Sequence, residues 1–192
     1  MKHHRIAIFA SGNGSNAILL QTYFENNTTI DVHAIYTNNP NAGIISKGKE
    51  LNIPVHILTA EQLADGHKLV DLMLSEGITC IVLAGYLKII PPQLVTAFPN
   101  TIINIHPALL PKYGGKGMYG MHVHKAVKAA NEKESGITIH VVNENYDEGK
   151  HIAQFSCILS ETDSPEDIQT KVQKLEHAHF ASTIEAYLTN TL

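Results

Sequence analysis

The sequence has few cysteines and only a small excess of one charge. Its 192 residues contain two cysteines, Cys80 and Cys157, and each lies inside an apolar run. That position is typical of a small core residue and not of a disulfide framework. Lys and Arg total 14 against 18 Asp and Glu, a formal net charge of -4. Because nucleic-acid binding needs a basic surface to neutralise phosphates, we expect no nucleic-acid partner.

The chain also lacks a long apolar stretch, a linker, a repeat and a low-complexity segment. Met1 to Arg5 lead directly into the strand-like segment 6–10, which is far too short for a signal peptide or a membrane span. We therefore expect a cytoplasmic protein with no membrane partner. With 44% hydrophobic residues, residues 1–192 are sufficient for a single domain with a full core.

Short apolar runs alternate with helical patterns through the first half of the chain. The apolar runs are typical of strands buried on both faces and lie at 5–10, 32–37, 55–58, 79–84 and 101–105. Helical spacing occupies the intervals at 16–25, 43–51, 61–76 and 92–98. This alternation predicts a parallel sheet with right-handed crossovers.

The pattern changes after residue 105. A glycine-rich loop at 113–120 and a helix at about 122–131 precede two strands, 136–142 and 151–159. The connection between these strands is too short for a parallel crossover, so we expect them to pair antiparallel. A capped helix begins at Ser164 and continues almost to the C-terminus. The fold class is therefore α/β and Rossmann-like, a mostly parallel sheet with an antiparallel C-terminal strand pair and helices on both faces.

A glycine-rich turn follows the first predicted strand. Residues 11–16 read Ser-Gly-Asn-Gly-Ser-Asn and a helix begins there, so backbone N–H groups and a helix dipole favour an anion. An ordinary tight turn is one alternative, and a dinucleotide fingerprint is another. The second predicted strand ends in Thr37-Asn-Asn-Pro40, without the acid that binds ribose hydroxyls. This absence favours a phosphate monoester over a dinucleotide.

Two polar residues end the fifth predicted strand. Asn104 and His106 are two positions apart, so their side chains project from the same face. The carboxyl end of a central strand is where open parallel sheets bind ligands. A hydrogen-bonded structural histidine is the alternative for His106 alone, but Asn-x-His followed by Pro-Ala-Leu-Leu-Pro is a more specific pattern.

Three segments together resemble a known family. The string Asn104-Ile-His-Pro-Ala-Leu-Leu-Pro111, the loop Ser11 to Asn16 and the segment Asn143-Glu-Asn-Tyr-Asp-Glu-Gly149 are similar to those of the folate-dependent formyltransferases that act on phosphoribosylglycinamide. The resemblance covers essentially the whole chain. It implies transfer of a formyl group from 10-formyltetrahydrofolate, as cosubstrate, to the amine of glycinamide ribonucleotide in purine (IMP) biosynthesis, without a metal.

The resemblance also implies which residues act. Asn104, His106 and Asp147 correspond to the catalytic group. Residues 1–100 become a phosphate-binding half, and residues 101–192 a catalytic and folate-binding half. The implied contacts to the ribotide and its phosphate are Gly12, Asn13, Gly14, Ser15, Asn16, Gln173, Lys174, Leu175 and Glu176. The implied folate contacts are Leu87, Lys88, Ile89, Ile90, Asn104, Asn143, Glu144, Asn145, Tyr146 and Asp147.

Acyl transfer to an amine needs an oxyanion donor and a proton-transfer group. Asn104 has an amide N–H for the oxyanion, and His106 as an imidazolium can stabilise the same oxygen and move protons. We expect the charge of Asp147 to raise the pKa of His106, so that the acid form is available near neutral pH. A turn-capping role is the alternative for Asp147. His122-x-His124 and His177-x-His179 are poorly spaced for a helical metal chelate.

Other functions remain open at this point. A formyltetrahydrofolate hydrolase and an enzyme similar to methionyl-tRNA formyltransferase share this core, although they normally carry an additional domain, which we do not expect here. A nucleotide-binding module without catalysis is an alternative from another class. Binding alone does not need the proton-transfer group His106, so this alternative is disfavoured.

Overall fold

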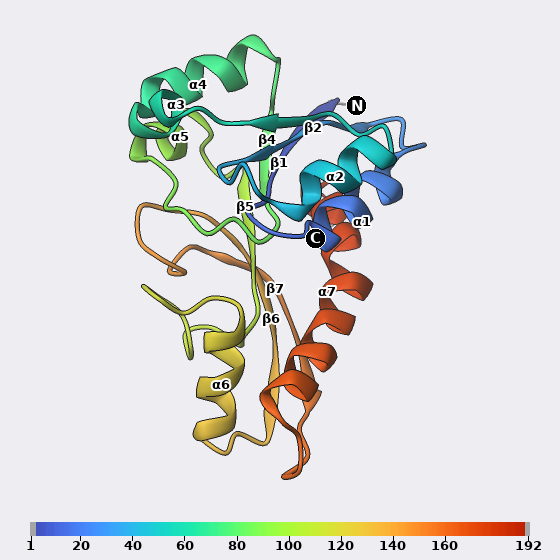
Figure 1. Cartoon of the computed structure of the whole chain (residues 1–192), viewed down its shortest axis with the longest axis vertical. Coiled ribbons are helices and arrows are strands. Elements are labelled where there is room, and N and C mark those ends of the chain that lie inside the picture. Colours follow the sequence, from blue (N-terminus) through green and yellow to red (C-terminus); the bar gives the residue numbers. More distant parts are fainter. Residues whose placement is uncertain (1–2, 191–192) are drawn as a thin grey trace. The chain divides into compact units, whose positions relative to one another are not determined.

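The computed structural model describes residues 3–190 and confirms the predicted α/β fold class. The strand order is β3-β2-β1-β4-β5-β6-β7. Figure 1 shows the strands and helices, coloured from the N-terminus to the C-terminus. Strand β1 pairs parallel with β2 and β4, β2 pairs parallel with β3, and β6 pairs antiparallel with β7. The elements are β1 (His4–Phe9), α1 (Ser15–Phe24), β2 (Ile30–Thr37), α2 (Gly43–Glu50), β3 (Val55–Ile57), α3 (Ala60–Ala64), α4 (Gly66–Ser75), β4 (Cys80–Leu83), α5 (Pro92–Ala97), β5 (Ile102–His106), α6 (Met121–Ala129), β6 (Glu134–Val141), β7 (His151–Ile158) and α7 (Pro165–Leu188).

The chain packs as two compact units, one up to Ile103 and the other from Asn104. In the first unit, every residue of β4 is buried, and β1 is buried from Ile6 to Phe9. This burial on both faces explains why both strands read as continuous apolar runs. Helix α1 packs on β2 and α2 on β3, so the parallel strands are covered as βαβ connections require.

The single helix predicted at 61–76 is wrong, because Asp65 divides it into α3 and α4. Asp65 has φ -114° and ψ 102°, outside the helical region, and its side chain accepts a 3.0 Å hydrogen bond from the His67 N–H. Asp65 therefore begins α4 as an N-cap. The Asp-Gly pair at 65–66 was the local sequence signal for this break.

The second unit is built on the antiparallel pair of β6 and β7. Strand β6 begins at Glu134, two residues before the predicted start, because Glu134 and Ser135 still pair with Ile158 and Cys157. Helix α7 packs against both strands and against α6. It begins as predicted, with the Ser164 side chain accepting from the Asp167 N–H in a capping box.

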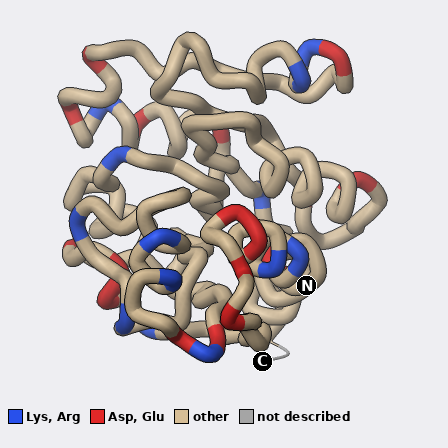
Figure 2. The backbone as a smooth tube through the Cα atoms, turned by 60° about the horizontal axis from the view of Figure 1, so that its bottom comes forward, with Lys and Arg blue, Asp and Glu red and all other residues tan. Residues whose placement is uncertain are grey.

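Acidic and basic residues are interspersed along the backbone (Figure 2). Long basic stretches, which would indicate a polyanion-binding segment, do not stand out in this view. Among residues 3–190, no helix has the length and apolar character needed to cross a membrane.

Candidate functional site

The second unit gathers a polar cluster around His106, at the end of β5. Asn104 and His106 alternate with the apolar Ile103 and Ile105, which places the two polar side chains on the same face. His106 is only 4% exposed, so each of its ring nitrogens needs a partner within the protein.

Both ring nitrogens of His106 face hydrogen-bond acceptors. Nε2 lies 2.8 Å from the carbonyl oxygen of Tyr113, which can only accept, so Nε2 carries a hydrogen. Nδ1 lies 3.5 Å from the Asp147 carboxylate oxygen Oδ2, an ion-pair distance longer than an ordinary hydrogen bond. The neutral ring therefore keeps its hydrogen on Nε2 and its basic lone pair on Nδ1, and protonation at Nδ1 creates a cation facing Asp147.

His140 on β6 is a member of the cluster that sequence reasoning missed. Its Nδ1 donates to the Val141 carbonyl oxygen at 3.0 Å, which leaves Nε2 to accept from the Asn104 amide nitrogen at 3.1 Å. The same Nε2 lies 3.6 Å from Asp147 Oδ1. A signal was present in the sequence, because the polar Thr138 and His140 alternate with apolar residues from Ile137 to Val141, and buried polar groups need partners.

Asp147 is held between the two histidines by an irregular loop. Its Oδ2 accepts a 2.9 Å hydrogen bond from the Gly115 N–H. Both Asp147 (φ 56°) and Tyr113 (φ 58°) have left-handed backbones, which cost about 1–2 kcal/mol per non-glycine residue. Such conformations persist where the surrounding contacts hold them, and they often mark functional sites. The structure thus brings the three predicted catalytic residues together through His140.

The Asp147 charge raises the pKa of His106 as predicted, but the expected acid form near neutral pH is wrong. Burial lowers the pKa of His106 below its ordinary value of 6.5, and this effect outweighs the raising effects of the Asp147 charge and of the hydrogen bond to the Tyr113 carbonyl; His140 lowers it further. Burial works against the charged form of Asp147 as well, but contacts with His140, His106 and the Gly115 N–H together lower the pKa of Asp147. The resting pair is therefore a neutral His106 beside an ionised Asp147 at neutral pH.

The first unit presents the predicted phosphate loop at a topological switch point. The chain leaves β1 toward β2 on one side and returns to β4 on the other, and such crevices are where open α/β sheets bind ligands. The loops that follow β1 and β4 are joined there, since Ser11 N–H donates to the Gly85 carbonyl at 3.1 Å and Leu87 N–H donates to Ser11 Oγ at 2.9 Å. The predicted phosphate loop and the predicted folate segment 87–90 thus adjoin in the first unit.

The glycines of the phosphate loop have different surroundings. Gly14 precedes α1 with φ 67°, and a Cβ there would lie 2.5 Å from Ile44 Cδ1, whereas a Cβ on Gly12 would meet nothing within 4 Å. Asn38 Oδ1 accepts from Ser11 Oγ at 2.6 Å. A dinucleotide site would have an acid near the end of β2. Here Asn38 follows β2 and holds Ser11 of the phosphate loop.

The remaining predicted contacts are mostly on surfaces. In the first unit, Leu87 and Ile89 are 55% and 57% exposed, Lys88 is exposed and Ile90 is buried. In the second unit, the segment Asn143 to Tyr146 is exposed on the loop before Asp147. Gln173 and Lys174 are exposed on α7, while Leu175 and Glu176 are half-buried. Exposed apolar side chains such as Leu87 and Ile89 are available to a ligand. Among residues 3–190, no three His, Cys, Asp or Glu side chains form a metal-binding group.

Comparison with known proteins agrees with the resemblance seen in the sequence. Residues 4–184 match the family described as formyl transferase. A phosphoribosylglycinamide formyltransferase of Bacillus subtilis is 33% identical over 189 residues, covering 96% of this chain and 94% of the relative. A crystal structure of the enzyme of that name from Bacillus halodurans has a TM-score of 0.86 and 33% identity, covering 98% of this chain and 97% of the other.

Plant relatives are longer. A chloroplastic phosphoribosylglycinamide formyltransferase of Arabidopsis thaliana is 39% identical over 191 residues and covers 96% of this chain. This chain spans 65% of that relative's length and 61% of the length of its counterpart from Vigna unguiculata. The family match, the bacterial relatives and the shared fold all agree, and the chain therefore belongs to the formyl transferase family.

Proposed function

We propose that this protein transfers the formyl group of 10-formyltetrahydrofolate to the amine of N1-(5-phospho-D-ribosyl)glycinamide. The products are the N2-formyl ribotide and tetrahydrofolate, a step of de novo purine biosynthesis. The observation that carries the proposal is the cluster of Asn104, His106 and Asp147, in which a buried imidazole lies beside a half-buried carboxylate and a half-buried amide donor. The names of the bacterial and plant relatives support the choice of substrate.

Formyl transfer requires a proton to move between two nitrogens. The substrate amine forms a bond to the formyl carbon, the carbonyl oxygen becomes an oxyanion, and the bond from that carbon to the folate nitrogen then breaks. The amine loses one proton, and the departing folate nitrogen gains one. Asn104 has a second amide hydrogen besides the one directed at His140, and in this proposal that hydrogen stabilises the oxyanion. Donors of this kind contribute about 10²- to 10³-fold in rate.

A lowered pKa suits His106 for this proton transfer. A ring that is neutral at rest can accept a proton at Nδ1 as the amine attacks. The developing oxyanion then raises the pKa of His106, because nearby negative charge favours the cation. Asp147, ionised at rest because its pKa is lowered, stabilises that cation. His106 returns the proton as the folate nitrogen leaves.

The two substrates divide between recognition elements in this proposal. The loop Gly12 to Asn16, with the N-terminus of α1, holds the ribotide phosphate, and residues 173–176 of α7 contribute further contacts. Folate contacts residues 87–90 and the loop 143–147. The exposed apolar Leu87 and Ile89 give the segment 87–90 an affinity for a flat aromatic ring system. The proposal includes no metal, and it places the enzyme in the cytoplasm, as predicted from the sequence.

Incubation of the purified protein with 10-formyltetrahydrofolate and glycinamide ribonucleotide tests the proposal. We expect tetrahydrofolate and the formylated ribotide to form in equal amounts, and we expect His106→Asn to abolish both. Glu161→Gln, a change of a surface acid that pairs with Lys133, is the matched control. Formate release without formylated ribotide would instead indicate a formyltetrahydrofolate hydrolase. Formylation only of added methionyl-tRNA would indicate an enzyme similar to methionyl-tRNA formyltransferase. Absence of all three products would leave the non-catalytic binding module.

A further inference from the structure

Tyr113 connects the catalytic histidine to a side chain outside the cluster. Its carbonyl oxygen lies 2.8 Å from His106 Nε2, and its phenol donates a 2.8 Å hydrogen bond to Glu132 Oε1. Glu132 lies in the turn between α6 and β6. The carbonyl that fixes the His106 ring therefore belongs to a residue whose side chain is anchored elsewhere.

Packing alone does not hold this residue. The segment 108–113 borders a cavity of about 240 Å³ that is also lined by Val127, Glu132 and Ser135, so one side of the segment lacks close-packed neighbours. Tyr113 also has the left-handed φ of 58°, which a bulky residue adopts only when other contacts impose it. Hydrogen bonds at the two ends of Tyr113 are the contacts that impose it here.

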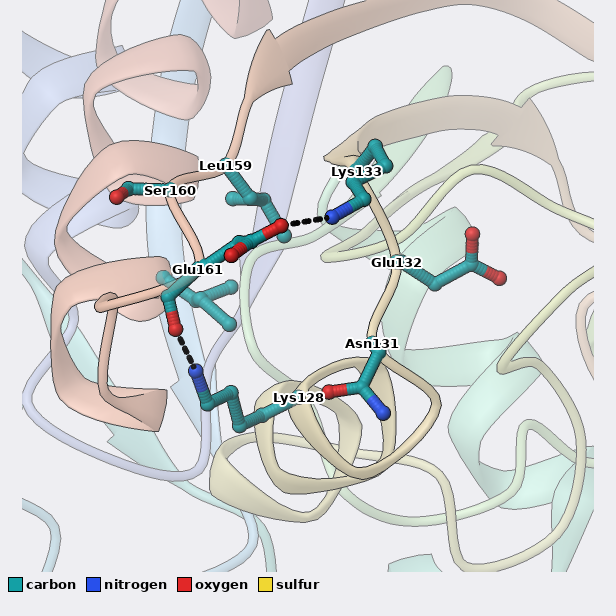
Figure 3. A pocket seen from close by; sticks show the side chains of 8 residues that line it. Lys128, Asn131, Glu132, Lys133, Leu159, Ser160 and Glu161 are labelled. Carbon is teal, nitrogen blue, oxygen red and sulfur yellow. Dashed lines mark hydrogen bonds and ion pairs between the residues drawn. The ribbon is translucent and has the colours of Figure 1, made fainter.

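The Glu132 carboxylate is directed to Tyr113 and not to the neighbouring ion pair. Figure 3 shows it pointing away from Lys133 and Glu161, which pair with each other. Lys112 also contacts Glu132 Oε1 at 2.9 Å, but the Lys112 side chain is 66% exposed. Exposed ion pairs contribute little to stability. The partly buried bond from the Tyr113 hydroxyl is therefore the contact by which Glu132 acts.

We propose that Glu132 is a positioning residue. By accepting a hydrogen bond from the Tyr113 hydroxyl, Glu132 holds the Tyr113 carbonyl against His106 Nε2, and this contact fixes the tautomer of His106. This inference rests on the proposed formyl transfer. With Nε2 committed to the carbonyl, Nδ1 keeps the basic lone pair that accepts the proton. If the carbonyl moved away, the hydrogen could shift to Nδ1 and donate to Asp147, and Nδ1 would lose the lone pair that the proposed proton transfer uses.

The test is an NMR titration of His106, with nitrogen chemical shifts reporting its tautomer, alongside steady-state kinetics. The variants are Tyr113→Phe, Glu132→Ala, their combination and Glu132→Gln, and the spectrum of His106→Asn assigns the resonance. Glu161→Gln is the control, because Glu161 is an acid near the same turn whose carboxylate pairs with Lys133 instead of Tyr113.

We expect Tyr113→Phe and Glu132→Ala to lower the His106 pKa, because the carbonyl contact raises it, and to reduce kcat by about threefold to tenfold, the effect of one hydrogen bond. KM values should change less. The combined variant should lose no more than the larger single change, since both remove the same contact. Glu132→Gln keeps an acceptor and should shift the pKa less than Glu132→Ala.

An unchanged His106 pKa and tautomer in Tyr113→Phe and Glu132→Ala would overturn the inference, even if thermal stability fell, because Glu132 would then be structural only. The titration needs no substrate. Failure of the proposed formyl transfer would appear as an inactive wild-type protein, whereas failure of the positioning role would appear in the His106 resonance.

Discussion

At the scale of single residues, two opposing effects set the pKa of His106. Burial disfavours its cation, while Asp147 and the Tyr113 carbonyl favour it, and burial has the larger effect. The balance leaves a base at rest whose cation is stabilised when negative charge develops. In the proposed formyl transfer, the same carboxylate that fails to keep His106 protonated in the free protein is available to stabilise its cation.

Replacing Asp147 by Asn tests this balance. The change removes the charge that raises the His106 pKa, so the pKa should fall further below its ordinary value. We expect kcat to fall by about 10²- to 10⁴-fold, because the imidazolium formed during attack loses its partner. NMR titration and kcat profiles measure both effects. Glu148→Gln, which changes the adjacent exposed acid, is the control; equal His106 pKa values in Asp147→Asn and wild type would favour a turn-capping role.

His140 should act through Asn104. Its Nε2 accepts from the Asn104 amide, and His140→Ala should free that amide to rotate and reduce kcat by about tenfold, the effect of a lost hydrogen bond to a group that must stay oriented. His140→Gln offers a carbonyl acceptor and should retain more activity. In a double-mutant cycle, His140→Ala should have little additional effect once Asn104→Ala is present. Fully additive losses would show that His140 acts independently of Asn104.

At the scale of elements, the turn between β1 and α1 depends on two glycines for different reasons. Gly14 needs a left-handed backbone and contacts Ile44 so closely that a Cβ does not fit, while the position of a Cβ on Gly12 is open. Gly14 is therefore required by the fold, and Gly12 leaves room at the surface of the predicted phosphate loop.

Alanine at each position separates folding from binding. Gly14→Ala should destabilise the protein by at least about 1–2 kcal/mol, the cost of the left-handed conformation alone. Gly12→Ala should unfold at the same urea concentration as wild type but bind ribotide more weakly, because the methyl group occupies the space that a phosphate approaches. Urea unfolding and equilibrium ribotide binding measure these effects. Undiminished ribotide affinity in Gly12→Ala would place the phosphate elsewhere.

At the scale of the whole molecule, buried histidines make stability depend on pH. Burial lowers the pKa of both His106 and His124 below 6.5, and in the unfolded chain both return to about 6.5. The unfolded state therefore binds more protons once the pH falls below about 6.5, so their contribution to stability is complete above that pH. It is lost progressively as the pH falls toward the lowered values.

We expect the free energy of unfolding to decrease as the pH falls below about 6.5 and to be nearly constant just above that pH. His124→Leu should reduce this dependence. It should also stabilise the protein by roughly 1 kcal/mol, because His124 Nδ1 is buried without a hydrogen-bond partner among residues 3–190. Urea unfolding at several pH values measures both effects. An equally steep loss in His124→Leu would assign the pH dependence to other groups.

The sequence by itself determined the elements and the principal polar residues. Local patterns suffice for these, because periodicity and capping act over a few residues: the buried strands, the Ser164 cap and the shared face of Asn104 and His106 all follow from neighbours in the chain. The break at Asp65 was missed although its signal was local, since the helical spacing continued across it.

Only the tertiary structure decided how these residues act. The proposed catalytic cluster is contacted by groups from other segments of the chain, namely His140, the Tyr113 carbonyl and the Gly115 N–H. No local sequence pattern specifies these contacts. The sign of the His106 pKa shift was also beyond the sequence. A carboxylate partner can be read from a motif, but the opposing effect of burial is the sum of everything packed around the ring, and that sum exists only once the chain has folded.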